Sequence, residues 1–231
     1  MALVKIPKVV DIYHGNRVQG FGNLTKAGIW GLIHKASQGA SYKDPAYLER
    51  RPVITSAGLL HGAYHFGTGD NVKSQVDNFL TAAAPSSSTL LALDWEDPPK
   101  GSSPMTYEQA VMFVQMLVDK LGRYPVLYSG NRVKDLLGKK SDPVLSKCRF
   151  WLAQYSPQPI TQASWPKGPW LWQYTEAGRL PGTDSALDFN AYDGSQSQLA
   201  SDWASQTPNV VQQPFLTPGP ASDPSAPFSV G

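Results

Sequence analysis

Short apolar runs recur along this chain, and helical patterns separate them through its first two thirds. This alternation is typical of parallel strands, because a parallel connection must cross back over the sheet and usually does so as a helix. Eight candidate strands suffice for a closed barrel, and 231 residues suffice for one domain of that size. We predict an α/β barrel with strands at residues 8–13, 31–36, 60–66, 90–95, 125–128, 150–153, 171–174 and 187–190.

The clearest helix signal begins at Thr106, which with Gln109 forms a Thr-x-x-Gln capping box. Gly122 ends the pattern, as glycine commonly does just after a helix. The apolar positions between them follow helical spacing, so we expect them to be core: Val111, Val114, Leu117, Val118 and Leu121. A second helix is expected at residues 72–84.

The last part of the chain follows a different pattern. After Phe150 the apolar runs are separated by loops rich in Pro and Gly, so we expect the last three strands to be joined without long helices. From Pro208 onward, prolines alternate with small and polar residues that cannot bury enough surface to offset the entropy of ordering. We therefore divide the chain into a barrel domain at 1–205 and a Pro-rich tail or linker at 206–231.

Composition narrows the possible partners. Charged residues make up 16% of the chain, aromatic residues 11%, and the formal net charge is +2, a balance that favours sugar over nucleic-acid phosphates. Cys148 is the single cysteine, so an intrachain disulfide is impossible. We recognise neither an export signal at the start nor an apolar stretch long enough to span a membrane.

Acidic residues stand at the ends of several expected strands. In the run LLALDWED, Asp94 and Glu96 are two residues apart and share one strand face, whereas Trp95 points to the other. A single Asp-x-Glu is more often a strand-end cap and a surface charge. Asp11 and Asp188, however, lie on the first and last strands, which are neighbours in a closed barrel. We therefore expect all four carboxylates to meet at the mouth where barrel enzymes place their chemistry.

Such a cluster has a chemical consequence. Carboxylates that lie close together repel one another, so at least one holds its proton near neutral pH. Cleavage of a glycosidic bond needs an acid for the leaving oxygen and an anion to stabilise the developing positive charge. The cluster predicts a glycoside hydrolase.

Blocks of sequence in the same order resemble a known family, the Chalaropsis-type lysozymes or glycoside hydrolase family 25. The resemblance covers roughly positions 8 to 194. It implies a TIM-like barrel of five β/α units followed by three β-strands. The matching blocks are VVDIYHG, IHKASQGASYKDP, AGLLHGAYHF, LALDWED, VLYSG, FWLAQY, LWQYTEAGRLPG and LDFNAYDG.

The resemblance also implies an activity and residue roles. Family members hydrolyse the β-1,4 bond between N-acetylmuramic acid and N-acetylglucosamine in bacterial peptidoglycan. By position, Glu96 is similar to the general acid/base, and Asp94 to the acid that steadies the N-acetyl group of the substrate as it assists the reaction. Asp11 and Asp188 resemble the flanking acids that tune this pair. The resemblance further implies that the anomeric carbon keeps its configuration and that no residue of the enzyme acts as a nucleophile.

The first block departs from the family pattern. Many relatives carry Ser two residues after the first-strand Asp and Gln soon after, whereas this chain has Tyr13, His14 and Asn16. The contacts of the first strand with sugar, and the preference among wall chemotypes, are therefore expected to differ.

Sugar rings stack on aromatic side chains, although most large aromatic residues are core. We predict contacts with substrate from residues at or near strand ends: Tyr64, His65, Trp95, Tyr128, Trp151, Tyr155, Gln173 and Tyr174. His61 and His65 lack an acidic third ligand at a recognised spacing, so we predict no metal and no cofactor.

Two alternatives remain open at this stage. A barrel can keep its fold and lose turnover, which would leave a non-catalytic module that binds cell walls. The same acids would also suit hydrolysis of another N-acetylated glycan, such as chitin. A wall-cutting enzyme without an export signal is expected to be released as a phage lysin or delivered by a specialised secretion system. The oligomeric state stays open as well.

Overall fold

The computed structural model describes residues 4–98 and 100–205. The predicted tail, residues 206–231, lies outside the described residues. Each of the eight expected strands is present within a few residues of its predicted bounds, and a short additional strand, β3, follows β2. The strands are β1 (Val9–Ile12), β2 (Gly31–Gln38), β3 (Tyr42–Lys43), β4 (Leu60–Phe66), β5 (Leu90–Asp94), β6 (Val126–Ser129), β7 (Phe150–Ala153), β8 (Leu171–Gly178) and β9 (Leu187–Ala191).

Eight of these strands form a closed barrel. They are hydrogen-bonded in the order β1, β9, β8, β7, β6, β5, β4 and β2, and pairing of β1 with β2 completes the ring. Neighbours from β1 through β8 run parallel, whereas β9 runs antiparallel to both β1 and β8. Because β9 closes the barrel against β1, residues from the two ends of the domain lie side by side, and Asp188 is paired with Asp11.

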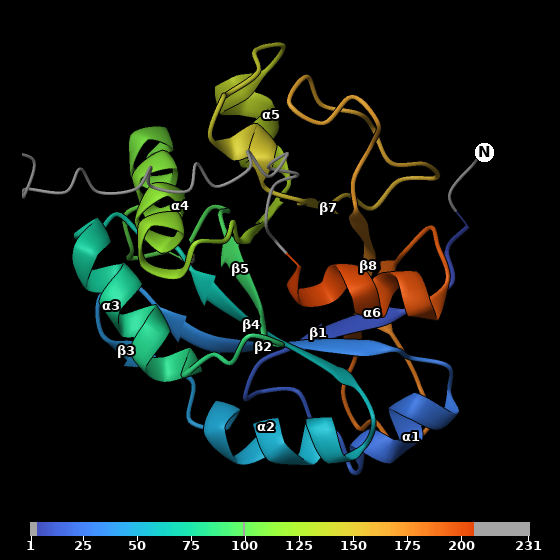
Figure 1. Cartoon of the computed structure of the whole chain (residues 1–231). Helices are drawn as coiled ribbons and strands as arrows, with labels where there is room; N and C mark the ends of the chain where they lie inside the picture. Colours follow the sequence, from blue (N-terminus) through green and yellow to red (C-terminus); the bar gives the residue numbers. More distant parts are fainter. Residues whose placement is uncertain (1–3, 99, 206–231) are drawn as a thin grey trace, which may run out of the picture.

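Helices cover the outside of this barrel (Figure 1). Between α5 and α6 the described residues form β7, β8, β9, loops and one 3₁₀ turn, η1 (Leu145–Lys147), with no α-helix, which agrees with the loops expected to join the last three strands. The helices are α1 (Phe21–Lys26), α2 (Tyr47–Ser56), α3 (Val72–Ala83), α4 (Tyr107–Leu121), α5 (Asn131–Leu137) and α6 (Gln196–Ala204).

Helix α4 has the predicted ends but a slightly different buried face. The Thr106 hydroxyl accepts a hydrogen bond from the Gln109 N–H, the Gln109 side chain accepts one from the Thr106 N–H, and Gly122 adopts φ 68°. Val114 and Leu117 are buried as predicted, whereas Leu121 is exposed. The buried stripe instead includes Ala110 and Phe113, because α4 packs on α3 along that face.

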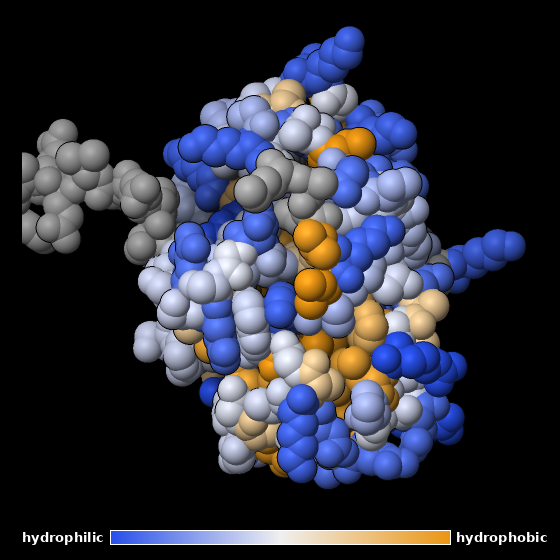
Figure 2. Space-filling model, turned by 90° about the vertical axis from the view of Figure 1, so that its right-hand side faces the viewer, coloured by the Kyte–Doolittle hydropathy of each residue, from blue (hydrophilic) through white to orange (hydrophobic). Residues whose placement is uncertain are grey.

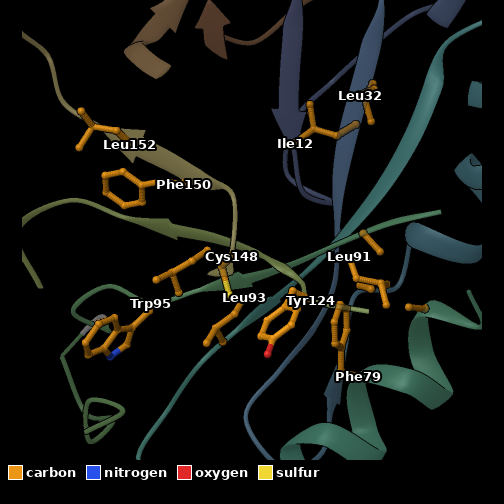
Figure 3. Close-up of a cluster of buried hydrophobic side chains, with 14 of the residues drawn as sticks. Ile12, Leu32, Phe79, Leu91, Leu93, Trp95, Tyr124, Cys148, Phe150 and Leu152 are labelled. Carbon is orange, nitrogen blue, oxygen red and sulfur yellow. The ribbon is translucent and has the colours of Figure 1, made fainter. Parts of the chain in front are cut away.

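Apolar side chains form two layers. One lies between the sheet and the helices, where Leu91 and Leu93 of β5 meet Phe79 of α3, and Cys148 is buried among them (Figure 3). The other fills the barrel interior, with Val9, Ile33 and other inward residues. Alternating side chains along each strand supply both layers, and this leaves the inward positions near the strand ends for polar groups.

Helix α6 closes the end of the barrel where the parallel strands begin. Trp203 and Leu199 pack with the interior residues, and the Trp203 Nε1 donates to the His61 carbonyl at 2.8 Å. A Cβ on Gly31 would lie 2.7 Å from the Trp203 ring, so glycine is needed for this close approach. The interior is therefore open only at the opposite end.

Candidate active site

The open end of the barrel gathers the four predicted acids in one cavity. Asp94 is the last residue of β5, Glu96 follows two residues later, and Asp11 and Asp188 face each other across β1 and β9. All four line a cavity of about 60 Å³ together with Tyr64, Tyr128 and Trp151. The predicted convergence is therefore present in the structure.

Asp11 forms the base of this cluster. It is buried, and it accepts hydrogen bonds from the Gln173 Nε2 at 3.2 Å and from the Asn190 Nδ2 at 2.7 Å. Burial, followed by the charge of Asp188, raises the pKa of Asp11 well above its usual value, and interaction between the two carboxyl groups raises it further. The pair therefore behaves as a partly neutralised unit.

Asp94 lies deep in the cavity and keeps one oxygen free. Its Oδ1 is buried and has no hydrogen-bond partner among the described residues. Burial and the nearby Glu96 raise the pKa of Asp94 well above its usual value. A buried acceptor without a donor is costly, so this oxygen is suited to an N–H or O–H that arrives with a ligand.

Glu96 is the acid best placed to exchange a proton near neutral pH. Burial, followed by the negative charge of Asp188, raises its pKa from 4.5 to about 7. Lys35, Asp97 and Glu176 make smaller contributions, of which only that of Lys35 lowers the pKa. Near neutrality Glu96 therefore exists in both protonation states, as a group that first donates and later accepts a proton requires.

Lys35 was not predicted as a site residue. It lies opposite Tyr64 in the pairing of β2 with β4, and its positive charge acts on Asp94, Asp44 and Glu96. Its Nζ donates to the Gln38 Oε1 at 2.6 Å. Because Lys35 stands two residues after the inward-facing Ile33, strand alternation alone would have identified it.

A wider groove adjoins the acid cavity. It encloses about 390 Å³ and shares Glu96 and Tyr128 with the cavity. Of its lining, only Glu96, Tyr128 and Tyr155 were predicted as site residues. The polar residues that follow β5, β6 and β7 were not predicted: Asp97, Asn131, Arg132 and Gln154. The acid cavity therefore adjoins a groove whose volume is in the range of small-molecule sites.

Comparisons with known proteins identify the family of this chain. The model of the family described as "Glycosyl hydrolases family 25" matches residues 10–183, which include Asp11, Asp94 and Glu96. The chain belongs to glycosyl hydrolase family 25. This confirms the resemblance seen in the sequence blocks and the predicted class of enzyme. Asp188 lies beyond the matched range.

Individual relatives of this family 25 chain are distant. It is 27% identical over 182 residues to "Uncharacterized protein YegX" of Escherichia coli O157:H7, covering 75% of this chain and 64% of that one. It is 25% identical over 207 residues to "Lysozyme M1" of Streptomyces globisporus, covering 82% and 69%. The crystal structure of the bacterial lysozyme from Streptomyces coelicolor matches its fold, with a TM-score of 0.76, 24% identity and coverage of 85% and 96%. The chain thus spans about two thirds of the length of these two relatives.

Five of the residues predicted to contact substrate lie in or beside the acid cavity. Tyr64, Tyr128 and Trp151 line it directly. The Gln173 amide oxygen accepts hydrogen bonds from the hydroxyls of Tyr128 at 3.0 Å and Tyr155 at 3.1 Å, while its nitrogen holds Asp11. Gln173 therefore connects the acids to the aromatic wall.

The other three of these residues do not face the cavity, and their predictions need correction. His65 is buried between Phe79 and Phe113 and bonds to Ser37 and Gln75. Trp95 is buried outside the barrel, where its Nε1 donates to the Met105 carbonyl. Tyr174 packs on Trp172 and Phe189 in the outer layer. Each follows an inward-facing residue directly, so strand alternation turns it outward.

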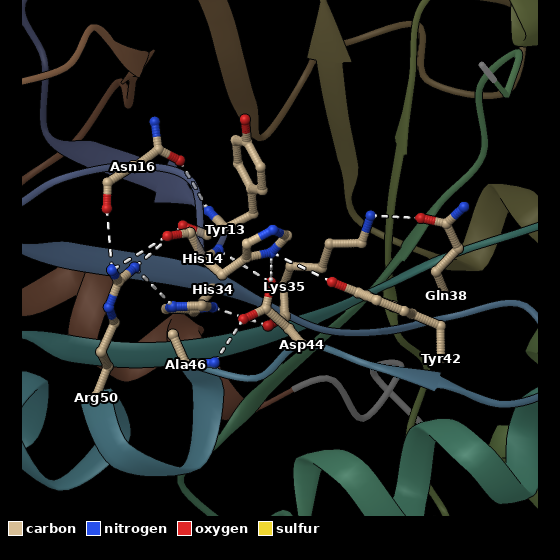
Figure 4. Close-up of polar contacts among 10 residues, drawn as sticks. All are labelled: Tyr13, His14, Asn16, His34, Lys35, Gln38, Tyr42, Asp44, Ala46 and Arg50. Carbon is tan, nitrogen blue, oxygen red and sulfur yellow. Dashed lines mark hydrogen bonds and ion pairs between the residues drawn. The ribbon is translucent and has the colours of Figure 1, made fainter.

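The residues that depart from the family pattern form a fixed rim beside the mouth (Figure 4). The buried Asp44 accepts from both the backbone N–H and the Nδ1 of His14 at 2.9 Å. Arg50 donates to the carbonyls of Tyr13 and Asn16 at 3.0 Å. These bonds hold the loop after β1 rigidly and leave the rings of Tyr13 and His14 exposed.

The role of Lys35 can be tested through the pH dependence of activity. Its positive charge lowers the pKa values of Glu96 and Asp94, so replacing Lys35 with Met will raise both. We expect the decline of kcat/KM at alkaline pH to move to higher pH in Lys35→Met. Lys35→Arg, which keeps the charge, is the matched control. An unmoved decline in Lys35→Met would show that the charge does not act on the acids.

In residues 4–98 and 100–205, no helix is long and apolar enough to cross a membrane. The same part of the chain contains no group of His, Cys, Asp and Glu residues arranged to hold a metal ion.

Proposed function

We propose that this chain is an N-acetylmuramidase, which hydrolyses the β-1,4 bond between N-acetylmuramic acid and N-acetylglucosamine in bacterial peptidoglycan. The observation that carries the proposal is the meeting of four carboxyl groups in one cavity, with Glu96 at a pKa of about 7. A protonated acid beside other carboxylates is what cleavage of a glycosidic bond requires. Membership of family 25 supports the same reaction.

In this proposal Glu96 acts twice. It first donates its proton to the oxygen that leaves with one sugar, while the carbonyl oxygen of the substrate's own N-acetyl group bonds to the anomeric carbon. A water molecule then attacks that carbon, the acetyl oxygen leaves, and Glu96 takes a proton from the water. Because the anomeric carbon is attacked twice, its configuration is retained.

The other acids assist this step. The free Oδ1 of Asp94 accepts the N–H of the acetamido group and so orients the carbonyl for attack. The Asp11 and Asp188 pair keeps the pKa of Glu96 high, since Asp188 is its largest electrostatic contribution. We propose that the enzyme acts at the cell wall. We also describe its barrel as five β/α units followed by three strands.

Two alternatives are separated by one assay. Purified peptidoglycan and chitin are each incubated with the protein, and the reducing sugars released are measured. Release from peptidoglycan but not from chitin supports the muramidase. Binding to peptidoglycan without release would favour a non-catalytic wall-binding module, and release from chitin would favour a broader glycan hydrolase.

The pH profile gives a further test. Glu96 must be protonated to start the reaction, and its pKa is about 7, so activity is lost as the pH rises through that value. On the acid side, protonation of the neighbouring carboxylates lowers activity again. We expect a bell-shaped plot of kcat/KM with an acidic optimum and an alkaline decline centred near pH 7. A profile that keeps rising above this range would exclude Glu96 as the proton donor.

A further inference from the structure

A second groove lies at the end of the barrel opposite the acids, and the proposed reaction makes no use of it. Trp170 directly precedes β8, and Tyr192 directly follows the antiparallel β9, so both lie at the end that α6 closes. The groove encloses about 430 Å³. We call it the α6 groove and define it by Lys167, Trp170, Tyr192, Asp193, Gln198 and Asp202.

Aromatic side chains form a rigid wall of the α6 groove. The rings of Trp170 and Tyr192 meet edge to face at 5.9 Å, and the Arg149 guanidinium lies 5.3 Å from the Trp170 ring centre. The Tyr192 hydroxyl donates to the Asp202 Oδ2 at 3.1 Å, which fixes the ring. Both rings are only partly buried, so a ligand in the groove meets preorganised aromatic surface.

The charges of the α6 groove nearly cancel. Asp202 lies 3.7 Å from the Arg149 guanidinium, and the lining also contains one further residue of each charge, Lys167 and Asp193. A groove of this kind does not select a polyanion, whereas amide and carboxylate side chains beside aromatic rings suit the hydroxyl groups and apolar ring faces of a sugar. Its volume is in the range of small-molecule sites.

One donor in the wall of the groove has no partner. The Nε1 of Trp170 is shielded from solvent and has no hydrogen-bond acceptor among the residues that the structure describes. Unpaired buried donors are rare in folded proteins, so a donor of this kind on a residue that lines the groove suits an acceptor oxygen of a ligand.

Helix α6 packs into the barrel end through Leu199 and Trp203, whereas its exposed Gln198 lines the groove. Figure 2 shows that the side of the molecule drawn at the right of Figure 1 is largely hydrophilic, with a band of hydrophobic residues among polar ones.

We propose that the α6 groove is a second, non-catalytic binding site for an N-acetylated glycan. The choice of cell-wall glycan as the ligand rests on the proposed function. Because the groove and the acid cavity open at opposite ends of the barrel, one short oligosaccharide cannot occupy both. The site therefore holds a neighbouring strand of the insoluble wall while the acids act on another.

The test uses exposed residues, so that folding is preserved. Asp193→Ala combined with Gln198→Ala removes two polar groups of the groove, and Asp135→Ala combined with Gln196→Ala is the matched control on exposed positions outside it. All proteins carry Glu96→Gln, which keeps the polymer intact. We expect sedimentation with purified peptidoglycan to show about tenfold weaker binding for the groove variant, and unchanged binding for the control.

The same groove substitutions in a second set of proteins that keep the native Glu96 supply a readout of activity. We expect the groove variant to hydrolyse insoluble peptidoglycan more slowly and to hydrolyse soluble wall oligosaccharides at the wild-type rate. Trp170→Phe, which keeps an aromatic ring and removes the N–H, is expected to behave in the same way. Equal binding of wall by the groove variant and the control would overturn the site.

The two proposals fail in different ways. If the wild-type protein releases no sugar but the groove variant still binds the wall less tightly, the muramidase proposal fails and the α6 groove stands. If wall hydrolysis is normal and binding is insensitive to the groove substitutions, the groove proposal fails and the muramidase stands.

A soluble ligand gives a further test. The Glu96→Gln protein is titrated with chitotetraose, and tryptophan fluorescence is recorded. We expect the amplitude of the fluorescence change to be smaller when Trp170→Phe is added.

Discussion

Replacing Glu96 with Gln should reduce the release of sugars from peptidoglycan by about 10²–10⁴-fold, the usual contribution of a general acid and base. Gln has nearly the same shape but carries no exchangeable acidic proton, so the leaving oxygen departs without protonation. The measurement is the initial rate of reducing-sugar release from purified wall. Glu108→Gln makes the same chemical change on the exposed surface of α4 and is expected to retain the wild-type rate.

Measuring the free energy of unfolding distinguishes a loss of catalysis in Glu96→Gln from a loss of folding. Folding raises the pKa of Glu96 from 4.5 to about 7, so the folded state binds the proton more tightly than the unfolded state. The free energy of unfolding therefore falls as the pH rises between these two values, and it is lower at neutral pH than it would be without this group. Glu96→Gln is thus expected to be at least as stable as the wild type at pH 7. A stable variant with a near wild-type rate would contradict the assigned role.

The second large effect concerns stability alone. Trp203 is buried, packs inside the barrel end and donates to the His61 carbonyl. Replacing it with Ala should lower the free energy of unfolding by about 3–5 kcal/mol, because truncation of a buried aromatic residue leaves a cavity. Urea denaturation measures this change. Losses of this size are a large fraction of the stability of a typical domain.

Two further variants make the Trp203 result specific. Trp203→Phe keeps a ring in the barrel end and should lose less than Trp203→Ala, while Ser201→Ala on the exposed side of α6 should leave stability nearly unchanged. A loss of less than about 1 kcal/mol in Trp203→Ala would mean that α6 is not needed to close the barrel.

The alternation of side chains explains both what the sequence could predict and where the prediction was wrong. It correctly placed Asp94 and Glu96 on one face and Trp95 on the other. We nevertheless included Trp95 among the substrate contacts, as well as His65 and Tyr174. These three residues were predicted to contact substrate because they lie near strand ends. Each of them directly follows a residue that faces inward, so its own side chain faces outward.

Other features depend on contacts that no local pattern encodes. The register of β2 with β4 shifts between Lys35 and Ser37, an irregularity that re-aims side chains near the mouth. Asp44 and Arg50 lie far along the chain from the loop that they hold, so the rim beside the first strand could not be predicted. The α6 groove likewise combines residues from three separate segments.

The pairing of Asp188 with Asp11 also has a consequence for the synthesis of the protein. A ribosome releases β9 after all the other strands of the barrel, so a growing chain has three of the four acids long before it has a closed ring to hold them. An incomplete polypeptide therefore lacks the shared proton and the shielded pocket. A cell that makes this protein is exposed to a competent hydrolase only after nearly the whole barrel has been translated.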